Sequence, residues 1–205
     1  MKKLLLSLTL AVFASSASAT IIDFIDMADN TVGEKGFATL NISAAGTNLA
    51  ITGHASNDDD AQQFAYLDSG NAGLGACKDV NNANQCTPSS DDNVTDFEYL
   101  SFVFDQDVTI NNFWFNNNHD GGFDADDLVT IDGNAYSVLT GYAGDANGVG
   151  SFVLLAGQSI DIAFNNEQFY VSAMEFTTTA VPEPASAILL SLGLLGLGSM
   201  RRRLR

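Results

Sequence analysis

The sequence predicts an all-β fold, an antiparallel β-sandwich of jelly-roll type, for the body of this 205-residue chain. Apolar and polar residues alternate with a period of two along most of the chain, which is the pattern of half-buried strands. Clusters of Gly, Asn and Asp interrupt these runs, as turns do. Helical periodicity is almost absent outside the hydrophobic ends, and no repeat of fixed length is visible. We therefore expect seven to nine short strands in a sandwich, not a β-helix or a propeller.

In the front half, residues 37–42 and 49–52 read as two strands joined by Ala44-Ala45-Gly46-Thr47. Further on, Leu100, Phe102 and Phe104 alternate onto one face of a strand. The polar residues 105–107 then turn the chain into a strand that runs from 108 to 115. We expect these last two strands to form a hairpin.

A second hairpin is expected where residues 128–131 and 135–139 flank Asp132-Gly133-Asn134, because this tripeptide permits positive φ. Three more strands are expected at 151–155, 160–164 and 169–176, separated by short polar turns.

The N-terminal residues 1–19 have the composition of a secretory signal peptide. Lys2 and Lys3 precede an apolar run, and Ala17-Ser18-Ala19 forms an A-x-A cleavage site. The mature chain is therefore expected to begin at Thr20. The body, residues 20–180, is long enough to bury a core of its own as one domain.

The body is strongly acidic. It contains 24 acidic residues against two lysines, Lys35 and Lys78, which gives a net charge of −22. Such a surface repels nucleic acids and anionic membranes, so neither is an expected partner of the body. Two explanations for the charge stay open, namely solubility of an exported protein and binding of divalent cations.

The two cysteines, Cys77 and Cys86, lie in a loop-like stretch rich in Gly, Asn and Asp. In an exported protein a close pair favours a disulfide, which we expect to stabilise the fold by about 2–3 kcal/mol. No CxxC spacing or nearby histidine completes a zinc site. A catalytic thiol is not expected.

The longest acidic segment, residues 120–127, is a candidate calcium loop. Ca²⁺ prefers six to eight oxygen ligands, which loops of Asp, Asn and Gly supply. The segment does not match an EF-hand. We name Asp120, Asp124 and Asp126 as candidate ligands, with a solvated acidic loop as the alternative. No other cofactor is indicated.

No catalytic motif of a hydrolase or phosphotransferase is present around the two histidines, His54 and His119. The sequence therefore predicts no enzymatic activity. Trp114 lies between two aromatic residues that we expect in the core, so it faces the opposite side of its strand. There it either stacks on a sugar ring or lies beneath a loop, and we expect the loop.

The chain ends in three consecutive elements: a Pro-Glu-Pro linker, an uncharged segment at residues 185–200, and an arginine-rich tail. The uncharged segment spans about 24 Å as a helix, which is short for a permanent anchor. The arginines favour a cytoplasmic tail and place the body outside. The residues concerned are Val181, Pro182, Glu183 and Pro184 of the linker and Arg201, Arg202, Arg203 and Arg205 of the tail.

This layout resembles the PEP-CTERM sorting signal of Gram-negative bacteria, over residues 181–205. The resemblance implies export by the Sec machinery, transient anchoring in the inner membrane, and removal of the tail by an exosortase. After this removal the protein would reach the cell surface or the extracellular space. The alternative is an ordinary tail anchor with a chance Pro-Glu-Pro.

A weaker resemblance covers the body. The segments AYLDSGNAGLGAC, QCTPSSDDN and EYLSFVFDQDVTINNFWFNNNHDGGF are similar to the ectodomain of a group of exosortase-dependent surface proteins. The resemblance implies a small surface or matrix β-domain whose biochemical activity is undefined, so it carries no catalytic residues over to this chain. We expect a non-enzymatic surface or extracellular-matrix protein that is associated with exopolysaccharide or biofilm. A carbohydrate-binding module with a calcium-stabilised sandwich is the alternative function.

Overall fold

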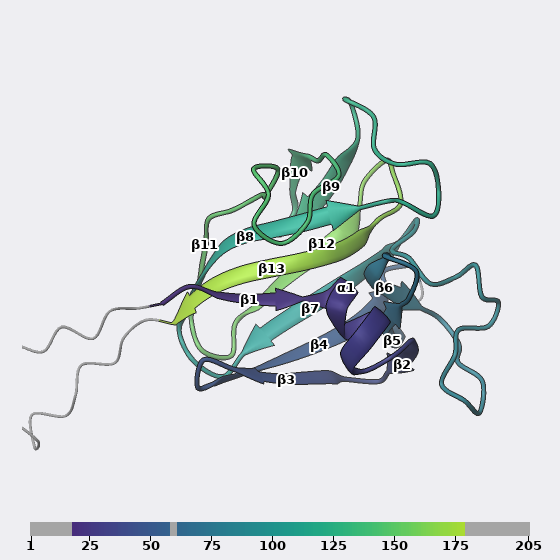
Figure 1. Ribbon diagram of the computed structural model, residues 1–205, viewed down its shortest axis with the longest axis horizontal. Helices are drawn as coiled ribbons and strands as arrows, with labels where there is room; N and C mark the ends of the chain where they lie inside the picture. The colour runs from purple at the N-terminus through teal and green to yellow at the C-terminus, as the bar shows by residue number, and fades with distance from the viewer. Residues whose placement is uncertain (1–17, 58–60, 179–205) are drawn as a thin grey trace, which may run out of the picture. The chain divides into compact units, whose positions relative to one another are not determined.

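The computed structural model describes residues 18–57 and 61–178, and in this part of the chain thirteen strands form one curled antiparallel sheet (Figure 1). The all-β, antiparallel class expected from the sequence is confirmed. Two short helical segments, α1 (Phe24–Asp26) and the π-helical η1 (Met27–Thr31), follow the first strand. The strands are β1 (Thr20–Asp23), β2 (Lys35–Phe37), β3 (Leu40–Ala44), β4 (Thr47–Ala55), β5 (Ala61–Asp68), β6 (Gly73–Cys77), β7 (Glu98–Phe104), β8 (Val108–Asn116), β9 (Leu128–Ile131), β10 (Asn134–Ser137), β11 (Phe152–Leu154), β12 (Ser159–Phe164) and β13 (Tyr170–Thr178).

The sheet folds back on itself into two layers that are continuous through β5. One layer follows the order β10-β9-β12-β7-β4, with β3 beside β4. The other follows β6-β13-β8-β11, with β1 beside β13 and β2 beside β5. Residues 61–63 of β5 pair with β4, whereas residues 64–68 pair with β6, so β5 passes from one layer to the other. The finer description as a jelly roll stays a prediction.

Aromatic side chains fill the space between the layers. The ring centroids of Phe102 on β7 and Phe113 on β8 are 5.4 Å apart, and those of Phe104 on β7 and Phe176 on β13 are 5.1 Å apart. All four rings are fully buried. Each such side chain contributes about 1.5–3 kcal/mol to the free energy of folding through removal of apolar surface from water.

The prediction that the strands on either side of residues 105–107 form a hairpin is wrong. β7 pairs with β4 and β12, whereas β8 pairs with β13 and β11, so the two strands lie in opposite layers. The turn between them is bonded to β4 instead, because Asp105 accepts hydrogen bonds from Thr47 Oγ1 (2.7 Å) and Asn48 N (2.8 Å). Both strands have a row of large apolar side chains, and in opposite layers these rows pack against each other.

The other expected hairpins are confirmed. β9 and β10 are joined by Asp132 and Gly133, both of which have positive φ (51° and 79°), as a two-residue turn of the I′ type requires. β3 and β4 are joined in the same way by Ala45 and Gly46. The three expected late strands are β11, β12 and β13. The expected number of strands in the front half was too low, because β1, β2, β5 and β6 were not expected.

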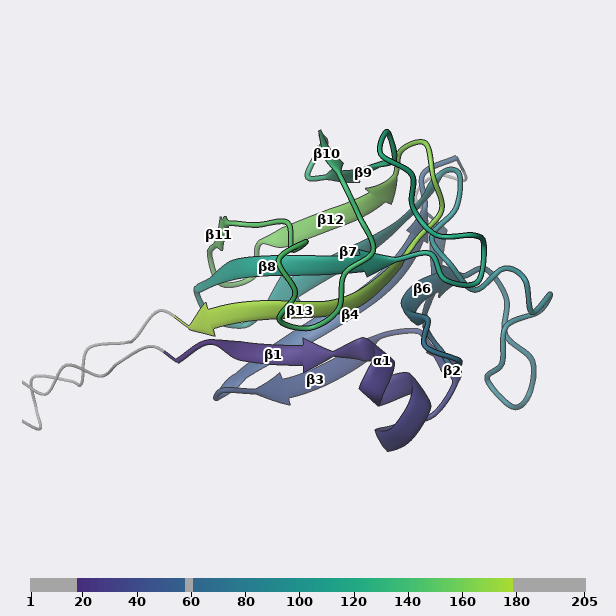
Figure 2. The same ribbon diagram turned by 45° about the horizontal axis from the view of Figure 1, so that its top comes forward.

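The two ends of the body leave it side by side. β1 pairs with β13, with Thr20 opposite Phe176, so the first strand begins where the last strand ends. Figures 1 and 2 both place these strand ends at one end of the molecule and the long loop between β6 and β7 at the other.

Candidate functional site

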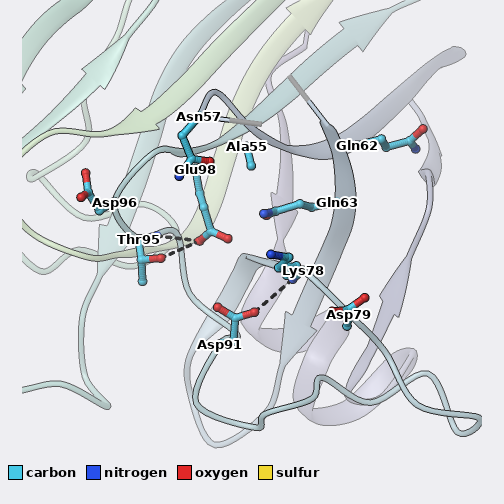
Figure 3. A pocket seen from close by; sticks show the side chains of 10 residues that line it. All are labelled: Ala55, Asn57, Gln62, Gln63, Lys78, Asp79, Asp91, Thr95, Asp96 and Glu98. Carbon is cyan, nitrogen blue, oxygen red and sulfur yellow. Dashed lines mark hydrogen bonds between the residues drawn. The ribbon is translucent and has the colours of Figure 1, made fainter. Parts of the chain in front are cut away.

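A pocket of about 370 Å³ lies where the end of β4 and the start of β5 meet the loop that precedes β7 (Figure 3). Its lining is polar, and the described lining residues include four carboxylates and one ammonium group. Neither the pocket nor its lining was expected from the sequence. The lining residues are Ala55, Asn57, Gln62, Gln63, Lys78, Asp79, Asp91, Thr95, Asp96 and Glu98.

The best-positioned group in the pocket is the carboxylate of Glu98, which is only 6% exposed. Its Oε2 accepts hydrogen bonds from the backbone N–H (2.9 Å) and the hydroxyl (2.8 Å) of Thr95. The second carboxylate oxygen points away from Thr95 and towards Gln63 (Figure 3). Burial raises the pKa of Glu98, and the hydrogen bonds from Thr95 oppose part of that rise.

Gln63 and Lys78 complete the inner part of the pocket. Gln63 is 6% exposed, and its carboxamide points towards Glu98 (Figure 3), while its Oε1 has no hydrogen-bond partner within the described residues. The backbone N–H of Lys78 donates to Asp91 Oδ2 (3.2 Å). Among the described residues, the ammonium of Lys78 makes no ion pair within 4.0 Å. The ion pair found in this part of the chain joins His119 to Asp68.

A disulfide fixes one wall of the pocket. Cys77 and Cys86 are joined, as expected, with their Cα atoms 5.9 Å apart. Cys77 is the last residue of β6 and is fully buried, so it does not lie in a loop as the composition suggested. The bridge holds the loop that begins with Lys78 and Asp79 against Tyr66. Asp91 lies within 4.8 Å of the sulfurs, but sulfurs joined in a disulfide are not thiolate ligands for a metal.

A second cluster of polar groups surrounds Asp68 at the end of β5. Asp68 is 5% exposed, and its Oδ2 lies 3.1 Å from Nδ1 of His119. Burial and the neighbouring carboxylate of Asp92 raise the pKa of Asp68 to about 6, although His119 opposes the rise. Asp92 accepts a hydrogen bond from the hydroxyl of Tyr170 (2.8 Å).

This cluster does not have the arrangement of a hydrolytic triad. Nε2 of His119 lies 3.1 Å from the carbonyl oxygen of Gly70, so both ring nitrogens have partners. The hydroxyl of Ser69 donates to Glu34 Oε2 (2.7 Å) and not to the imidazole. The other histidine, His54, stacks on Tyr99 of the neighbouring strand, with centroids 4.8 Å apart.

The structure does not bring the candidate calcium ligands together. Asp120, Asp124 and Asp126 are all exposed, and Asp120 accepts a hydrogen bond from Nδ2 of Asn93 (3.0 Å). Among the described residues, the group of three acidic, cysteine or histidine side chains with ligand atoms within 4.8 Å of one another lies elsewhere. It consists of Cys77, Cys86 and Asp91. The calcium site at residues 120–127 therefore stays a prediction.

Trp114 lies beneath a loop, as we expected, and is only 2% exposed. Its Nε1 donates to the carbonyl oxygen of Asp145 (2.8 Å), in the loop between β10 and β11. A sugar ring cannot stack on this indole while the loop covers it. The aromatic platform that would favour a carbohydrate-binding module is therefore not at Trp114.

The remaining predicted site residues belong to the C-terminal segment, which comparison with family models identifies. The model of the PEP-CTERM protein-sorting motif matches residues 180–203. The chain carries a PEP-CTERM sorting signal. The signal marks the chain as an exported protein that an exosortase targets, with anchoring in the membrane before release. The match includes the Pro-Glu-Pro linker and all of the tail arginines except Arg205.

No curated protein and no solved structure matches the chain. Almost all of the expected signal peptide, together with the linker, the apolar segment 185–200 and the arginine tail, lies outside the described residues. Within residues 18–57 and 61–178, no helix has the length and apolar character needed to span a membrane.

Glu98 and Gln63 carry a signal in the sequence that none of the predicted sites includes. Glu98 continues the alternation of Leu100, Phe102 and Phe104 to an inward-facing position, where an acidic side chain is unusual. Gln63 likewise precedes the buried Ala65 by two residues. A polar residue at an inward-facing position of an alternating strand is therefore the sequence signal that could have identified this pocket.

Proposed function

We propose that this chain is a non-enzymatic cell-surface or extracellular-matrix protein that is displayed after exosortase processing and associates with exopolysaccharide. The observation that carries the proposal is the sorting motif at residues 180–203. It supports export, anchoring and processing, and thereby a place of action outside the cell.

The arrangement of the body is consistent with display. Because β1 and β13 pair with Thr20 opposite Phe176, the chain enters and leaves the body at one end. The C-terminal sorting signal therefore follows a strand that ends there. The β6–β7 loop, which contributes Lys78, Asp79 and Asp91 to the pocket, lies at the other end of the body (Figures 1 and 2). A tethered body can thus reach a partner outside the membrane with these loops.

Two observations support a binding or structural role over catalysis. Both ring nitrogens of His119 are engaged, and the described contacts include no hydroxyl bonded to it. The alternative, a carbohydrate-binding module with a calcium-stabilised sandwich, has less support, because Trp114 is buried and the candidate calcium ligands are dispersed.

The sorting part of the proposal is tested by replacing Pro182-Glu183-Pro184 with three alanines in a host that contains an exosortase. We expect export to continue but tail removal to stop, so that the protein accumulates in the inner membrane. Immunoblots of membrane and released fractions measure this. Ser186→Ala, a change just beyond the motif, is the control and should be processed normally. Normal release of the triple mutant would contradict the proposal.

A further inference from the structure

We propose that the end of the body at which β1 begins and β13 ends docks on the lipid surface of the membrane while the sorting signal anchors the chain (Figures 1 and 2). The proposal rests on the anchoring that the sorting signal implies. It goes beyond the expectation from the net charge, which gives the body no membrane partner of its own. We call this surface the terminal face, and it is formed by residues 18–20, 44–48, 105–109, 153–159 and 177–178.

Strand pairing and turn contacts bring these segments together. Val108, the first residue of β8, pairs with Leu154 of β11 on one side and with Thr178 of β13 on the other. The turn after β11 reaches the turn before β8, where the backbone N–H of Ala156 donates to Asp107 Oδ1 (2.8 Å). That turn before β8 is also bonded to the start of β4, and β1 begins beside the end of β13.

The terminal face carries the two most exposed large apolar side chains of the described residues. Val153 is 73% exposed and Leu155 is 61% exposed. Val153 is in register with Thr109 of β8, which is in register with Thr177 of β13. Thr109 lies between two buried residues of β8, so this uncharged row faces away from the core. A single exposed leucine needs no explanation, but two aliphatic side chains beside an uncharged row form a surface that suits a bilayer interface.

The terminal face has little of the charge of the body. Its charged side chains are Asp105 and Asp107, and both accept hydrogen bonds from backbone N–H groups of neighbouring segments. Glu175 of β13 lies on the next outward-facing row and accepts a hydrogen bond from Nδ2 of Asn112 (3.1 Å). An anionic membrane therefore repels the rest of the body more strongly than this end. The repulsion favours an orientation with the terminal face towards the lipid.

The chain between the body and the apolar segment keeps this face near the membrane. Residues 179–184 separate the end of β13 from the apolar segment 185–200, and a chain of that length spans at most about 20 Å. Leu154 is two strands away from Thr178, which is about 10 Å at the usual strand spacing. In an anchored chain, Val153 and Leu155 are thus within reach of the lipid interface, and docking requires only a change of orientation.

A lipid surface fits these observations better than a second copy of the chain does. Two bodies with a net charge of −22 each repel one another. Two exposed aliphatic side chains also supply only a small part of the about 800 Å² per partner that a stable protein interface buries. A weak contact is sufficient for a tethered body, because the tether keeps its effective concentration at the membrane high.

The test uses the full chain, expressed in a host without an exosortase so that the tail is retained, in vesicles of equal parts phosphatidylcholine and phosphatidylglycerol. Ala156→Cys places a bimane label on the terminal face, and Ala125→Cys places it in the exposed loop that follows the other end of β8. Labelling without a reductant leaves the Cys77–Cys86 bridge intact. A lipid-bound nitroxide should quench the label at position 156 and leave the label at position 125 almost unchanged.

Substitutions of exposed apolar residues separate docking from mere proximity. The double variant Val153→Ser, Leu155→Ser should shift the equilibrium between docked and undocked bodies about tenfold towards the undocked form, because two apolar side chains no longer leave water. Quenching at position 156 should then fall towards the value at position 125. Leu139→Ser is the matched control, because Leu139 is 49% exposed but adjoins the residue that pairs with Phe115, near the other end of β8. It should leave the quenching unchanged, and urea denaturation followed by tryptophan fluorescence checks that each variant is folded.

Flotation of the vesicles distinguishes failure of this proposal from failure of the sorting assignment. A chain that does not float with the vesicles contradicts the anchoring and, with it, the docking. A chain that floats overturns the docking alone if the label at position 156 is not quenched, or if the double variant is quenched as strongly as the wild type.

Two further outcomes would assign the terminal face to another partner and overturn the lipid proposal. A change in bimane emission that depends on protein concentration in detergent, without lipid, would identify a second copy of the chain. Slower tail removal from the double variant in a host with an exosortase, together with unchanged quenching, would identify the processing enzyme.

Discussion

Asp68→Asn should stabilise the protein at pH 7, although it removes one partner of an ion pair with His119. Asp68 is 5% exposed and its pKa is raised from 3.8 to about 6, chiefly by burial and by Asp92. A raised pKa means that the folded state binds the proton more tightly than the unfolded state. This tighter proton binding adds to the free energy of unfolding. The added stability is fully present below pH 3.8 and is lost as the pH rises through 6.

The size of the effect follows from the difference between the two pKa values. A difference of about 2.2 units corresponds to at most about 3 kcal/mol between low pH and pH 7, at 1.36 kcal/mol per unit. About half of that change falls between pH 5 and pH 7.5, a range that avoids the isoelectric region near pH 4.1. Asparagine does not titrate, so the difference in unfolding free energy between wild type and variant isolates Asp68 from the other carboxylates.

The assay is urea denaturation of both proteins at several values between pH 5 and pH 7.5, followed by tryptophan fluorescence. We expect the wild type to lose about 1–1.5 kcal/mol relative to the variant as the pH rises over this range. His119→Asn should move the loss to higher pH, because the imidazole lowers the pKa of Asp68. Parallel stability curves for wild type and Asp68→Asn would refute the reasoning.

Three further predictions concern the disulfide, the acidic loop and the tryptophan. Replacing Cys77 and Cys86 with alanine should lower the unfolding free energy by about 2–3 kcal/mol in chemical denaturation, because the bridge closes a loop with a sequence separation of 9; two free thiols in freshly exported protein would contradict the bridge. Ca²⁺ at about 10 mM should add roughly 1.5–3 kcal/mol if residues 120–127 bind it with the affinity of extracellular modules, with NaCl and Mg²⁺ as controls; an equal gain in an Asp124→Asn, Asp126→Asn double mutant would show that the loop is not the site. Trp114→Phe should cost about 1–2 kcal/mol in the same assay, because it removes the hydrogen bond to the loop carbonyl; no loss of stability would mean that the loop does not depend on this contact.

The local pattern of the sequence predicted the strands that have one buried face. In β7 the period-two alternation matches the burial of Leu100, Phe102 and Phe104, and in the β9–β10 hairpin the Asp-Gly turn matches the positive φ angles. β6 was not expected, because the residues Gly73–Cys77 are all buried and therefore do not alternate. The pairing of β7 with β8 failed for another reason. Alternation determines which side of a strand is apolar, but not whether the next strand lies beside it or across the core.

The candidate sites show the same limit. The disulfide was predicted because the two cysteines are close in the sequence. The pair of Asp68 and His119 depends on contacts between the end of β5 and the turn after β8, which only the topology brings together. The pocket combines β4, β5, the β6–β7 loop and the start of β7, so no single segment contains its pattern.

The place of the last strand connects folding with the sorting signal. β13 lies in the middle of its layer, where it pairs with β8, β6 and β1, and its residues Met174 and Phe176 are fully buried. If the chain is exported from its N-terminus, as the expected signal peptide implies, the core cannot close until residue 178 has reached the outside. The sorting signal begins directly after this strand, at residue 180. Cleavage beyond residue 178 would therefore remove none of the thirteen strands of the described body. The order of the two elements thus lets the body fold before the tail is removed.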